Sequence, residues 1–170
     1  MYFDYIETPI GLIKCHASEL GITEVEFSAS RIGECNANQH TELCLIQLAE
    51  YFSGVRKTFD LPLAPHGSHF QKTVWLCLAK IPYGQLLSYA DIARMINNPK
   101  ASQAVGGANA KNPLAIIIPC HRVIGCNGKL TGYAGGLHRK HWLLEHEGIT
   151  INGLADQQKI AIEDYRYCVS

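Results

Sequence analysis

The two halves of this 170-residue chain carry different folding signals. Before residue 30, three runs rich in β-branched and aromatic residues are separated by proline and glycine, which predicts strands at 2–6, 10–17 and 22–28. From Ser68 onward, apolar residues recur at helical spacing between helix-start signals. The sequence therefore predicts an α/β (α+β) protein, with a sheet lobe over residues 1–65 and a mainly helical domain over residues 66–170.

Two further elements are expected in the first lobe. A helix is predicted to follow Thr41 and to run to about Phe52, because apolar residues recur there on one face. The run at 58–63 (TFDLPL) alternates apolar and polar residues up to Pro62, as a strand does. Ala64–Gly67 follows as a connector between the two domains.

The second domain has the outline of a helix-turn-helix. Capping signals at Ser68 and Ser88 predict helices that begin just after each of these residues. Asn97-Asn98-Pro99 ends the second helix, and a third is expected from about Lys100 to Ala110. Two short helices joined by a tight turn are typical of DNA-binding modules.

One face of the expected third helix has only small or uncharged residues: Gln103, Gly106, Gly107 and Ala110. Each glycine inside a helix costs about 0.5–1 kcal/mol relative to alanine, so two adjacent glycines need a reason. Close approach of another backbone is one such reason. That backbone could belong to a DNA duplex or to a neighbouring helix of the same domain, and the sequence leaves both open.

The formal net charge is zero, but the charge is unevenly distributed. Residues 64–144 carry nine Lys or Arg against one acid, Asp91, so this segment is +8 and the remainder is −8. This division favours a basic module that meets phosphate, joined to an acidic module that does not. Ordinary surface charge that happens to cluster is the alternative.

Composition and cysteine usage narrow the class of protein. No apolar run is long enough to span a bilayer and the first residues lack a signal-peptide pattern, so a cytoplasmic protein without a membrane partner is expected. Seven irregularly spaced cysteines without a CxxC pair argue against a disulfide framework and a zinc ribbon. Buried thiols and surface imidazoles are favoured over a metal site among six scattered candidates: Cys15, His16, Cys35, His40, His66 and His69.

A short segment in the second domain carries the candidate chemistry. The apolar run at 114–118 (LAIII) lies between two prolines and predicts a short buried strand or extended segment. It leads into Pro119-Cys120-His121-Arg122, where an adjacent imidazole and guanidinium can lower the pKa of the thiol and so favour the nucleophilic thiolate. Glu147 is a candidate to orient His121 as a base. The glycines of Gly132–Gly136 permit a loop close around a planar ligand.

Taken in order, these segments resemble the O6-alkylguanine-DNA alkyltransferases. The matching pieces are Ser88-Tyr89, Asn98–Gly107 (NPKASQAVGG), Asn112-Pro113, Ile118–Val123 (IPCHRV), Gly132–Gly136 (GYAGG) and Trp142–Gly148 (WLLEHEG). The resemblance covers about residues 68–149 in register, whereas the first 60 residues resemble the family's N-terminal lobe only loosely. It implies an N-terminal ribonuclease H-like β-sheet lobe and a mainly helical C-terminal lobe with a helix-turn-helix.

The resemblance also implies roles for individual residues. Cys120 would accept the alkyl group, His121 would deprotonate it through a water, and Glu147 would hold His121. Tyr89 would press on the phosphate 3′ to the target and, with Lys140, support protonation of the departing guanine, while Asn112 would position the network behind Cys120. The guanine pocket would be lined by Val123, Tyr133, Ala134 and Gly135. DNA would be contacted by Ser88, Tyr89, Gln103, Ala104, Gly106, Gly107, Ala110 and Arg122.

The function implied by the resemblance is DNA repair by direct reversal. The O6-alkyl group of a flipped-out guanine, or the O4-alkyl group of thymine, would be transferred irreversibly to Cys120, once per molecule. The resemblance implies double-stranded DNA as the partner, a monomer and no cofactor. One residue departs from the family pattern: Gln103 stands where an arginine usually fills the space of the flipped base, so weaker base extrusion is expected.

Three other functions fit parts of the sequence. A non-catalytic alkyltransferase-like lesion-binding protein would lack the acceptor cysteine, which is present here. A Cys-His hydrolase would need an oxyanion hole, and no segment marks one. A transcription factor that uses only the helix-turn-helix would leave Pro119–Arg122 without a purpose.

Overall fold

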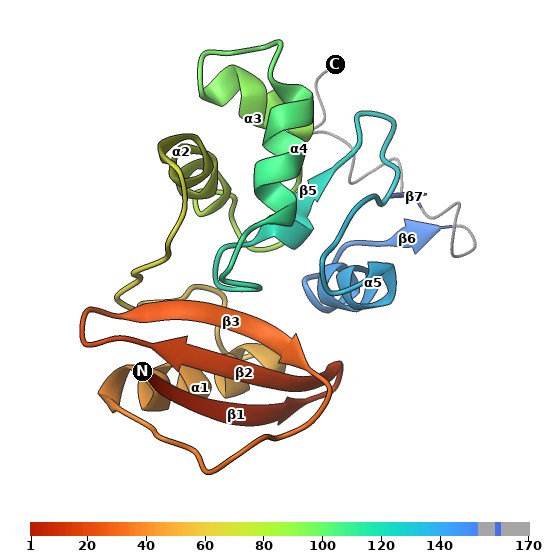
Figure 1. The fold of residues 1–170 in the computed structure, drawn as a ribbon. Helices are drawn as coiled ribbons and strands as arrows, with labels where there is room; N and C mark the ends of the chain where they lie inside the picture. The colour runs from red at the N-terminus through yellow and green to blue at the C-terminus, as the bar shows by residue number, and fades with distance from the viewer. Residues whose placement is uncertain (153–158, 161–170) are drawn as a thin grey trace. The chain divides into compact units, whose positions relative to one another are not determined.

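A computed structural model describes residues 1–152 and 159–160 and divides the chain into two compact units (Figure 1). The first unit comprises Met1–His66 together with Pro113–Ile117. The second comprises Gly67–Asn112 and the described residues from Ile118 onward. The division falls one residue after the predicted boundary, and the sequence did not indicate that a segment from the middle of the second domain joins the first unit.

The first unit is an antiparallel sheet packed against one helix. Strands β1 (Tyr2–Thr8), β2 (Gly11–Ala17) and β3 (Ile22–Ser28) pair in sequence order, as predicted. Alternate residues on one face, such as Cys15 and Val25, are buried, and helix α1 (Gln39–Phe52) packs against this sheet. The opposite face holds charged and aromatic residues. Asn38 caps α1 in a capping box with Thr41, so Thr41 lies in the first turn of the helix and, contrary to the prediction, does not precede it.

The strand predicted at 58–63 is wrong. Only Leu63 pairs with the sheet, through a single parallel bridge to Ile22. Pro62 lacks an N–H group and its carbonyl accepts from the Ile22 amide, so the segment cannot continue a two-sided ladder. The backbone at Pro62 lies very close to the backbone at Gly21, since a Cβ on Gly21 would lie 2.4 Å from the Pro62 carbonyl oxygen.

The short strand or extended segment predicted at 114–118 is wrong as well, although the predicted burial of most of the segment is confirmed. Leu114 makes one parallel bridge to Val25, and the chain then turns through residues 115–117. Ile116 adopts a φ of 71°, a conformation that disfavours a β-branched residue and is incompatible with a strand. An apolar run shows that a segment is buried, but periodicity does not fix its conformation.

The second unit is mainly helical, as predicted. Its helices are α2 (His69–Leu78), α3 (Tyr89–Met95), α4 (Ser102–Ala110) and α5 (Leu137–His146). Ser68 and Ser88 cap α2 and α3 in capping boxes, which confirms both predicted helix starts. Two short strands, β4 (Leu87–Ser88) and β5 (Val123–Ile124), pair in parallel and place the start of α3 beside the segment that follows Cys120. Strands β6 (Ile151–Asn152) and β7 (Lys159–Ile160) form a separate pair.

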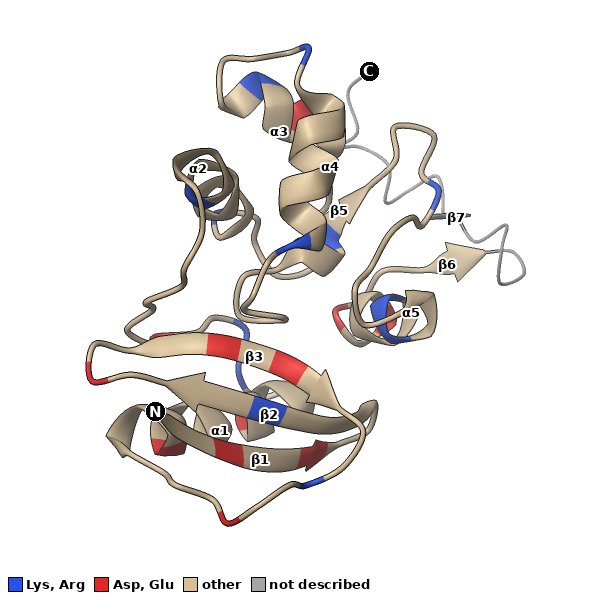
Figure 2. Ribbon diagram, in the orientation of Figure 1, with Lys and Arg blue, Asp and Glu red and all other residues tan. Residues whose placement is uncertain are grey.

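Charge is distributed over these elements as the sequence indicated. Figure 2 shows acidic residues along β1 and β3, and Lys or Arg on α2, α3 and the end of α4. In the part of the chain that the structure describes, no helix combines the length and the apolar character required to cross a bilayer.

Candidate functional site

Cys120 begins a short 3₁₀ turn, Cys120–Arg122, between Pro119 and β5. The turn is held locally, since the Cys120 amide donates to the Ile118 carbonyl at 2.8 Å and the Arg122 amide to the Pro119 carbonyl at 3.0 Å. The Cys120 residue is only 5% exposed. The turn therefore fixes three consecutive side chains of different chemistry in a buried place.

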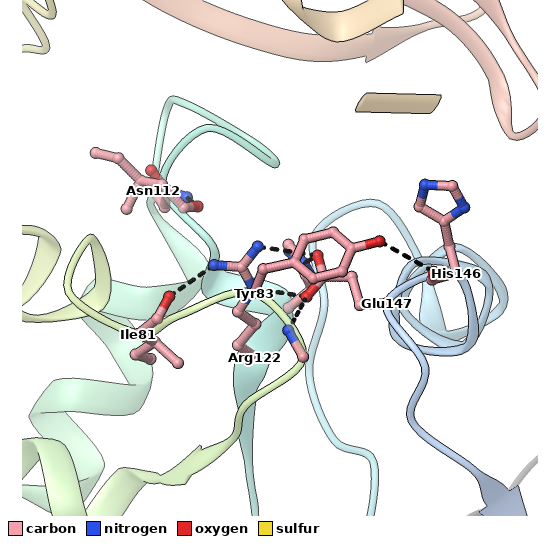
Figure 3. A network of polar contacts seen from close by, with 9 residues as sticks. Ile81, Tyr83, Asn112, Arg122, His146 and Glu147 are labelled. Carbon is pink, nitrogen blue, oxygen red and sulfur yellow. Dashed lines mark hydrogen bonds and ion pairs between the residues drawn. The ribbon is translucent and has the colours of Figure 1, made fainter. Parts of the chain in front are cut away.

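The carboxylate of Glu147, at the end of α5, is the centre of a buried polar network (Figure 3). It accepts from His121 Nε2 at 2.8 Å, from Arg122 Nε at 2.8 Å and Nη2 at 3.0 Å, and from the Gly84 amide at 3.2 Å. Burial opposes ionisation, but His121 and Arg122 outweigh it and hold the pKa of Glu147 well below its usual range. Glu147 is therefore an anion held by four donors, and the predicted contact between His121 and Glu147 is present.

Arg122 belongs to this network and not to a DNA-contacting surface. Its guanidinium binds Glu147 through two nitrogens, and Nη1 donates to the Ile81 carbonyl at 2.6 Å. The residue is 6% exposed. Ser88 is fully buried too, and its hydroxyl accepts from the Asp91 amide as the cap of α3. The structure thus corrects the expectation that Arg122 and Ser88 contact DNA: both support the fold of the site.

His121 is arranged to act as a base. Nε2 faces the Glu147 carboxylate, so the neutral ring carries its hydrogen there and leaves the lone pair on Nδ1. Nδ1 is buried and has no hydrogen-bond partner within the described residues. Burial lowers the pKa of His121, and this effect outweighs the opposite effect of Glu147. The imidazole is therefore neutral near pH 7 and can accept a proton at Nδ1.

The surroundings of the Cys120 thiol correct the expected pKa. Burial raises the pKa of Cys120. A hydrogen bond from Asn112, the charge of Lys140 and the backbone amides of Cys120 and His121 each lower this pKa, but burial has the larger effect. Arg122 does not lower it, because the guanidinium is committed to Glu147. The resting sulfur is accordingly a thiol, and a base must remove its proton before it can attack carbon.

Asn112 and Lys140 both interact with the Cys120 thiol and are held in place by hydrogen bonds to backbone carbonyls. Asn112 Nδ2 donates to the Ile118 carbonyl at 2.8 Å, which holds the amide beside Cys120. Lys140 is fully buried, and its Nζ donates to the carbonyls of Val123 at 2.6 Å and Thr131 at 2.8 Å. Burial lowers the pKa of Lys140 to about 8, against the opposite influence of Cys120. Lys140 is thus mostly charged at neutral pH and can lose its proton at slightly alkaline pH.

Among the residues predicted to contact the nucleotide, Tyr89 and Tyr133 lie close enough to Cys120 for its charge to affect their pKa values. The Tyr89 hydroxyl is 3.4 Å from Thr131 Oγ1. Burial is the main cause that raises the pKa of Tyr89, and negative charge on Cys120 raises it further. Tyr133 is buried, Gly135 is half-buried and Ala134 is exposed. The amide of Val123 donates to the Cys120 carbonyl and its own carbonyl accepts from Lys140, which leaves one carbonyl lone pair for a ligand.

The surroundings of Gly106 and Gly107 on α4 show whether packing inside the protein requires these glycines. Gln103, Ala104, Gly107 and Ala110 are exposed. A Cβ on Gly107 would meet no atom within 4 Å, and one on Gly106 would only reach ordinary contact with the Tyr89 ring at 3.9 Å. Packing inside the protein therefore does not require either glycine, which favours a surface that another molecule approaches closely.

Two contributors to the site were not found from the sequence. The composition of Pro82-Tyr83-Gly84 indicates only a turn, yet its Gly84 amide binds Glu147 and its Tyr83 hydroxyl donates to the His146 carbonyl. Thr131 links the surroundings of Lys140 and Tyr89. No local signal marks such contacts, because three of these four contacts join residues more than forty positions apart.

Two family models together cover nearly all of the described chain. Residues 1–65 match the family described as 6-O-methylguanine DNA methyltransferase, ribonuclease-like domain. Residues 69–149 match 6-O-methylguanine DNA methyltransferase, DNA binding domain.

Individual relatives agree with these matches. The methylated-DNA–protein-cysteine methyltransferase of Methanosarcina acetivorans is 48% identical over 154 residues, covering 87% of this chain and 99% of the relative. The Mycobacterium tuberculosis protein OGT, solved in complex with DNA, has a TM-score of 0.79 and 42% identity, covering 86% of this chain and 92% of that chain. An S. pombe ATL protein, also solved with DNA, has a TM-score of 0.52 and 28% identity over 59% of this chain and 95% of that chain.

Proposed function

The chain belongs to the 6-O-methylguanine DNA methyltransferase family, and we propose that Cys120 is the sulfur to which it transfers the alkyl group. The function is DNA repair by direct reversal, in which a methylated-DNA–protein-cysteine methyltransferase moves the methyl group from DNA to a cysteine of the protein. One observation carries the assignment of Cys120. Its buried thiol belongs to the residue that precedes His121 in the same 3₁₀ turn, and the Nε2 of that neutral imidazole is held by a buried carboxylate.

His121 activates the thiol. Nδ1 takes the proton from Cys120, through a water, and the resulting imidazolium is stabilised by the Glu147 anion on Nε2. The Asn112 amide and the Lys140 charge stabilise the thiolate as it forms. Arg122 keeps Glu147 ionised and aimed at His121. The thiolate is thus formed when it is needed and is not the resting state.

The transfer itself is a displacement at the alkyl carbon. The sulfur–carbon bond forms as the bond from that carbon to O6 of guanine breaks, and guanine leaves as the neutral base once it has gained a proton. Tyr89 and Lys140, linked through Thr131, support that protonation. The thioether has no ready route back to thiol, so each molecule acts once and no cofactor is used.

The substrate is proposed to be double-stranded DNA that carries O6-alkylguanine or O4-alkylthymine, bound by a monomer. The damaged base must leave the stack to meet a buried sulfur, at a cost of a few kcal/mol. The exposed small-residue face of α4 enters the minor groove, where Gly106 and Gly107 allow close contact. Tyr133, Ala134, Gly135 and the Val123 backbone surround the base.

Intact-mass spectrometry after incubation with O6-methylguanine DNA tests the proposal. A single adduct of about 14 Da is expected, since one methyl group replaces one hydrogen on sulfur. Peptide mapping should place it on Cys120. An unmodified mass despite lesion binding would favour a non-catalytic, alkyltransferase-like protein, and an adduct on another cysteine would refute the assignment.

Replacing Gln103 by arginine is expected to strengthen duplex binding and to speed transfer from duplex DNA. Gln103 is exposed on α4, and arginine adds a charge and a bidentate fork that glutamine lacks. An added phosphate contact should raise affinity several-fold and steepen the salt dependence of binding. The measurements are duplex affinity at two salt concentrations and single-turnover rate. If both match the parent protein, the inserting role of position 103 is wrong.

The transfer rate is expected to fall as pH rises through about 8. Lys140 has a pKa of about 8, so it is charged at pH 7 and largely neutral one unit above its pKa. Losing the charge removes support for the thiolate and for guanine protonation. Single-turnover rates from about pH 6.5 to 9.5 should show this alkaline limb in the parent protein. In Lys140→Met the rate should be lower and the limb absent; an unchanged limb in this variant would assign the titration to another group.

A further inference from the structure

A cluster in the first unit is not used by the repair chemistry. His16 lies on β2 and Glu24 and Glu26 on β3, on the sheet face opposite to the buried Cys15 and Val25. His16 pairs directly with Glu24 across the strands, and Glu26 follows two residues later on the same face. His16 Nε2 lies 3.4 Å from Glu24 Oε1 and 3.0 Å from Glu26 Oε2. All three ligand atoms lie within 4.8 Å of one another.

Two carboxylates therefore meet at one imidazole nitrogen. A proton on Nε2 can form a good hydrogen bond with only one of them at a time. A metal ion bonds to all three atoms at once. Zinc–ligand bonds of about 2.0–2.1 Å at tetrahedral angles put neighbouring ligand atoms about 3.3 Å apart. The separations of 3.0 and 3.4 Å from Nε2 are close to that spacing, so little rearrangement is needed to enclose an ion.

The charge around the cluster also favours a cation. Within the described residues, no Lys or Arg lies within ion-pair distance of Glu24 or Glu26, and their one basic neighbour at that distance is His16. Lys14 acts on both carboxylates from the same face, but its Nζ lies over the Phe3 ring, 4.5 Å from the centroid. Two carboxylates held this close repel each other unless a proton or a metal cation lies between them.

Two members of the cluster also line a pocket of the first unit. This pocket is lined by His16, Glu24 and His66, with Met1, Thr23 and Pro113 completing it. A ligand that enters the pocket would therefore meet part of the cluster. Two of the six scattered residues considered from the sequence, His16 and His66, therefore do line one pocket, and their partners are carboxylates and not thiols.

We propose that His16, Glu24 and Glu26 bind a divalent transition-metal ion such as Zn²⁺, with the fourth position open toward the pocket that His16 and Glu24 line. Imidazole with carboxylate suits zinc and its neighbours, whereas magnesium and calcium prefer all-oxygen sites. The ligands stand on two paired strands, so binding couples β2 to β3 and stabilises the folded first unit. The site lies outside the repair network and is independent of the transfer step.

Calorimetric titration of the full-length protein with zinc chloride tests this proposal. One ion per chain is expected, accompanied by a rise in the melting temperature. His16→Ala and the double variant Glu24→Gln/Glu26→Gln should each weaken binding at least about tenfold and abolish the rise in melting temperature. His141→Ala is the matched control, because His141 pairs with Glu145 at 2.8 Å and has no second carboxylate within ion-pair distance in the described part of the chain. The zinc affinity of His141→Ala should equal that of the parent protein.

Cobalt substitution separates this site from binding by cysteine. Cys35 and Cys126 are exposed thiols and could bind zinc themselves. Cobalt bound through nitrogen and oxygen gives weak visible bands without the intense near-ultraviolet band of a cobalt–thiolate bond. Expected is the weak spectrum alone, lost in His16→Ala and kept in Cys35→Ser/Cys126→Ser. A thiolate band, equal affinity in the parent and His16→Ala proteins, or no measurable binding by the parent would each overturn the proposal.

Discussion

Cys120→Ala is expected to abolish alkyl transfer completely while leaving lesion binding nearly intact. The variant removes the sulfur atom that is proposed to form the thioether, and the described network around it contains no second thiol. The fold should tolerate the change, because the thiol is small and its neighbours are held by their own bonds, such as Asn112 to the Ile118 carbonyl and Lys140 to the Val123 carbonyl. Loss of this buried sulfur atom should lower the free energy of unfolding by about 1 kcal/mol.

The measurements are the mass of the protein and its affinity for duplex DNA that contains O6-methylguanine. Cys126→Ala is the matched control: Cys126 is six residues further on and exposed, and its loss should leave the methyl adduct unchanged. A residual adduct in Cys120→Ala would show that another cysteine accepts the alkyl group. Loss of DNA binding together with transfer would indicate that Cys120 is needed for the fold.

Glu147→Gln is expected to have the second largest effect, on both rate and stability. The amide can accept fewer of the four hydrogen bonds, and its NH₂ group opposes the N–H donors of His121 and Arg122. His121 loses the fixed tautomer and the anion that stabilises its imidazolium, so the transfer rate should fall about a hundredfold or more. Arg122 is left as a buried charge without its counter-ion, which costs about 3–5 kcal/mol.

Glu145→Gln provides the control for Glu147→Gln. Glu145 lies two residues earlier, and its carboxylate pairs with His141 at 2.8 Å with about half of the side chain exposed. Its loss should change stability by less than about 1 kcal/mol and leave the rate unchanged. Single-turnover kinetics and denaturant unfolding measure the two effects. Equal behaviour of the two variants would contradict the role assigned to the buried network.

The contribution of Glu147 to stability should also depend on pH. Its folded-state pKa is depressed below the ordinary value of 4.5. The stabilisation is therefore fully present above that value and is lost as pH falls toward the folded-state pKa, because the unfolded chain takes up the proton first. Unfolding free energies measured at neutral and acidic pH should decline less in Glu147→Gln than in the parent protein over this window. An identical decline would mean that other carboxyl groups account for the acid sensitivity.

Elements whose cause is local were predicted well from the sequence. The capping boxes at Ser68 and Ser88 satisfy the first amides of α2 and α3 within one turn, so residues three apart decide where each helix begins. The three strands of the first unit follow from alternation and from glycine and proline at their ends. The two expected strands that failed, at 58–63 and 114–118, each touch the sheet at a single residue. The residue pattern of such a segment can show alternation and burial, but it does not show whether another strand lies beside the segment to pair with it along its length.

By itself the sequence determined the lobe types, the helix starts and the ordered set of motifs around Cys120, because each depends on neighbouring residues or on residue type. Only the tertiary structure decided how the charges of the site are used. Arg122 stands two residues from Cys120 but serves Glu147, 25 positions away, and burial then keeps the sulfur protonated until His121 acts. The ionisation of a group depends on what surrounds it in space and on how much water remains there, and neither quantity is written in the order of the residues.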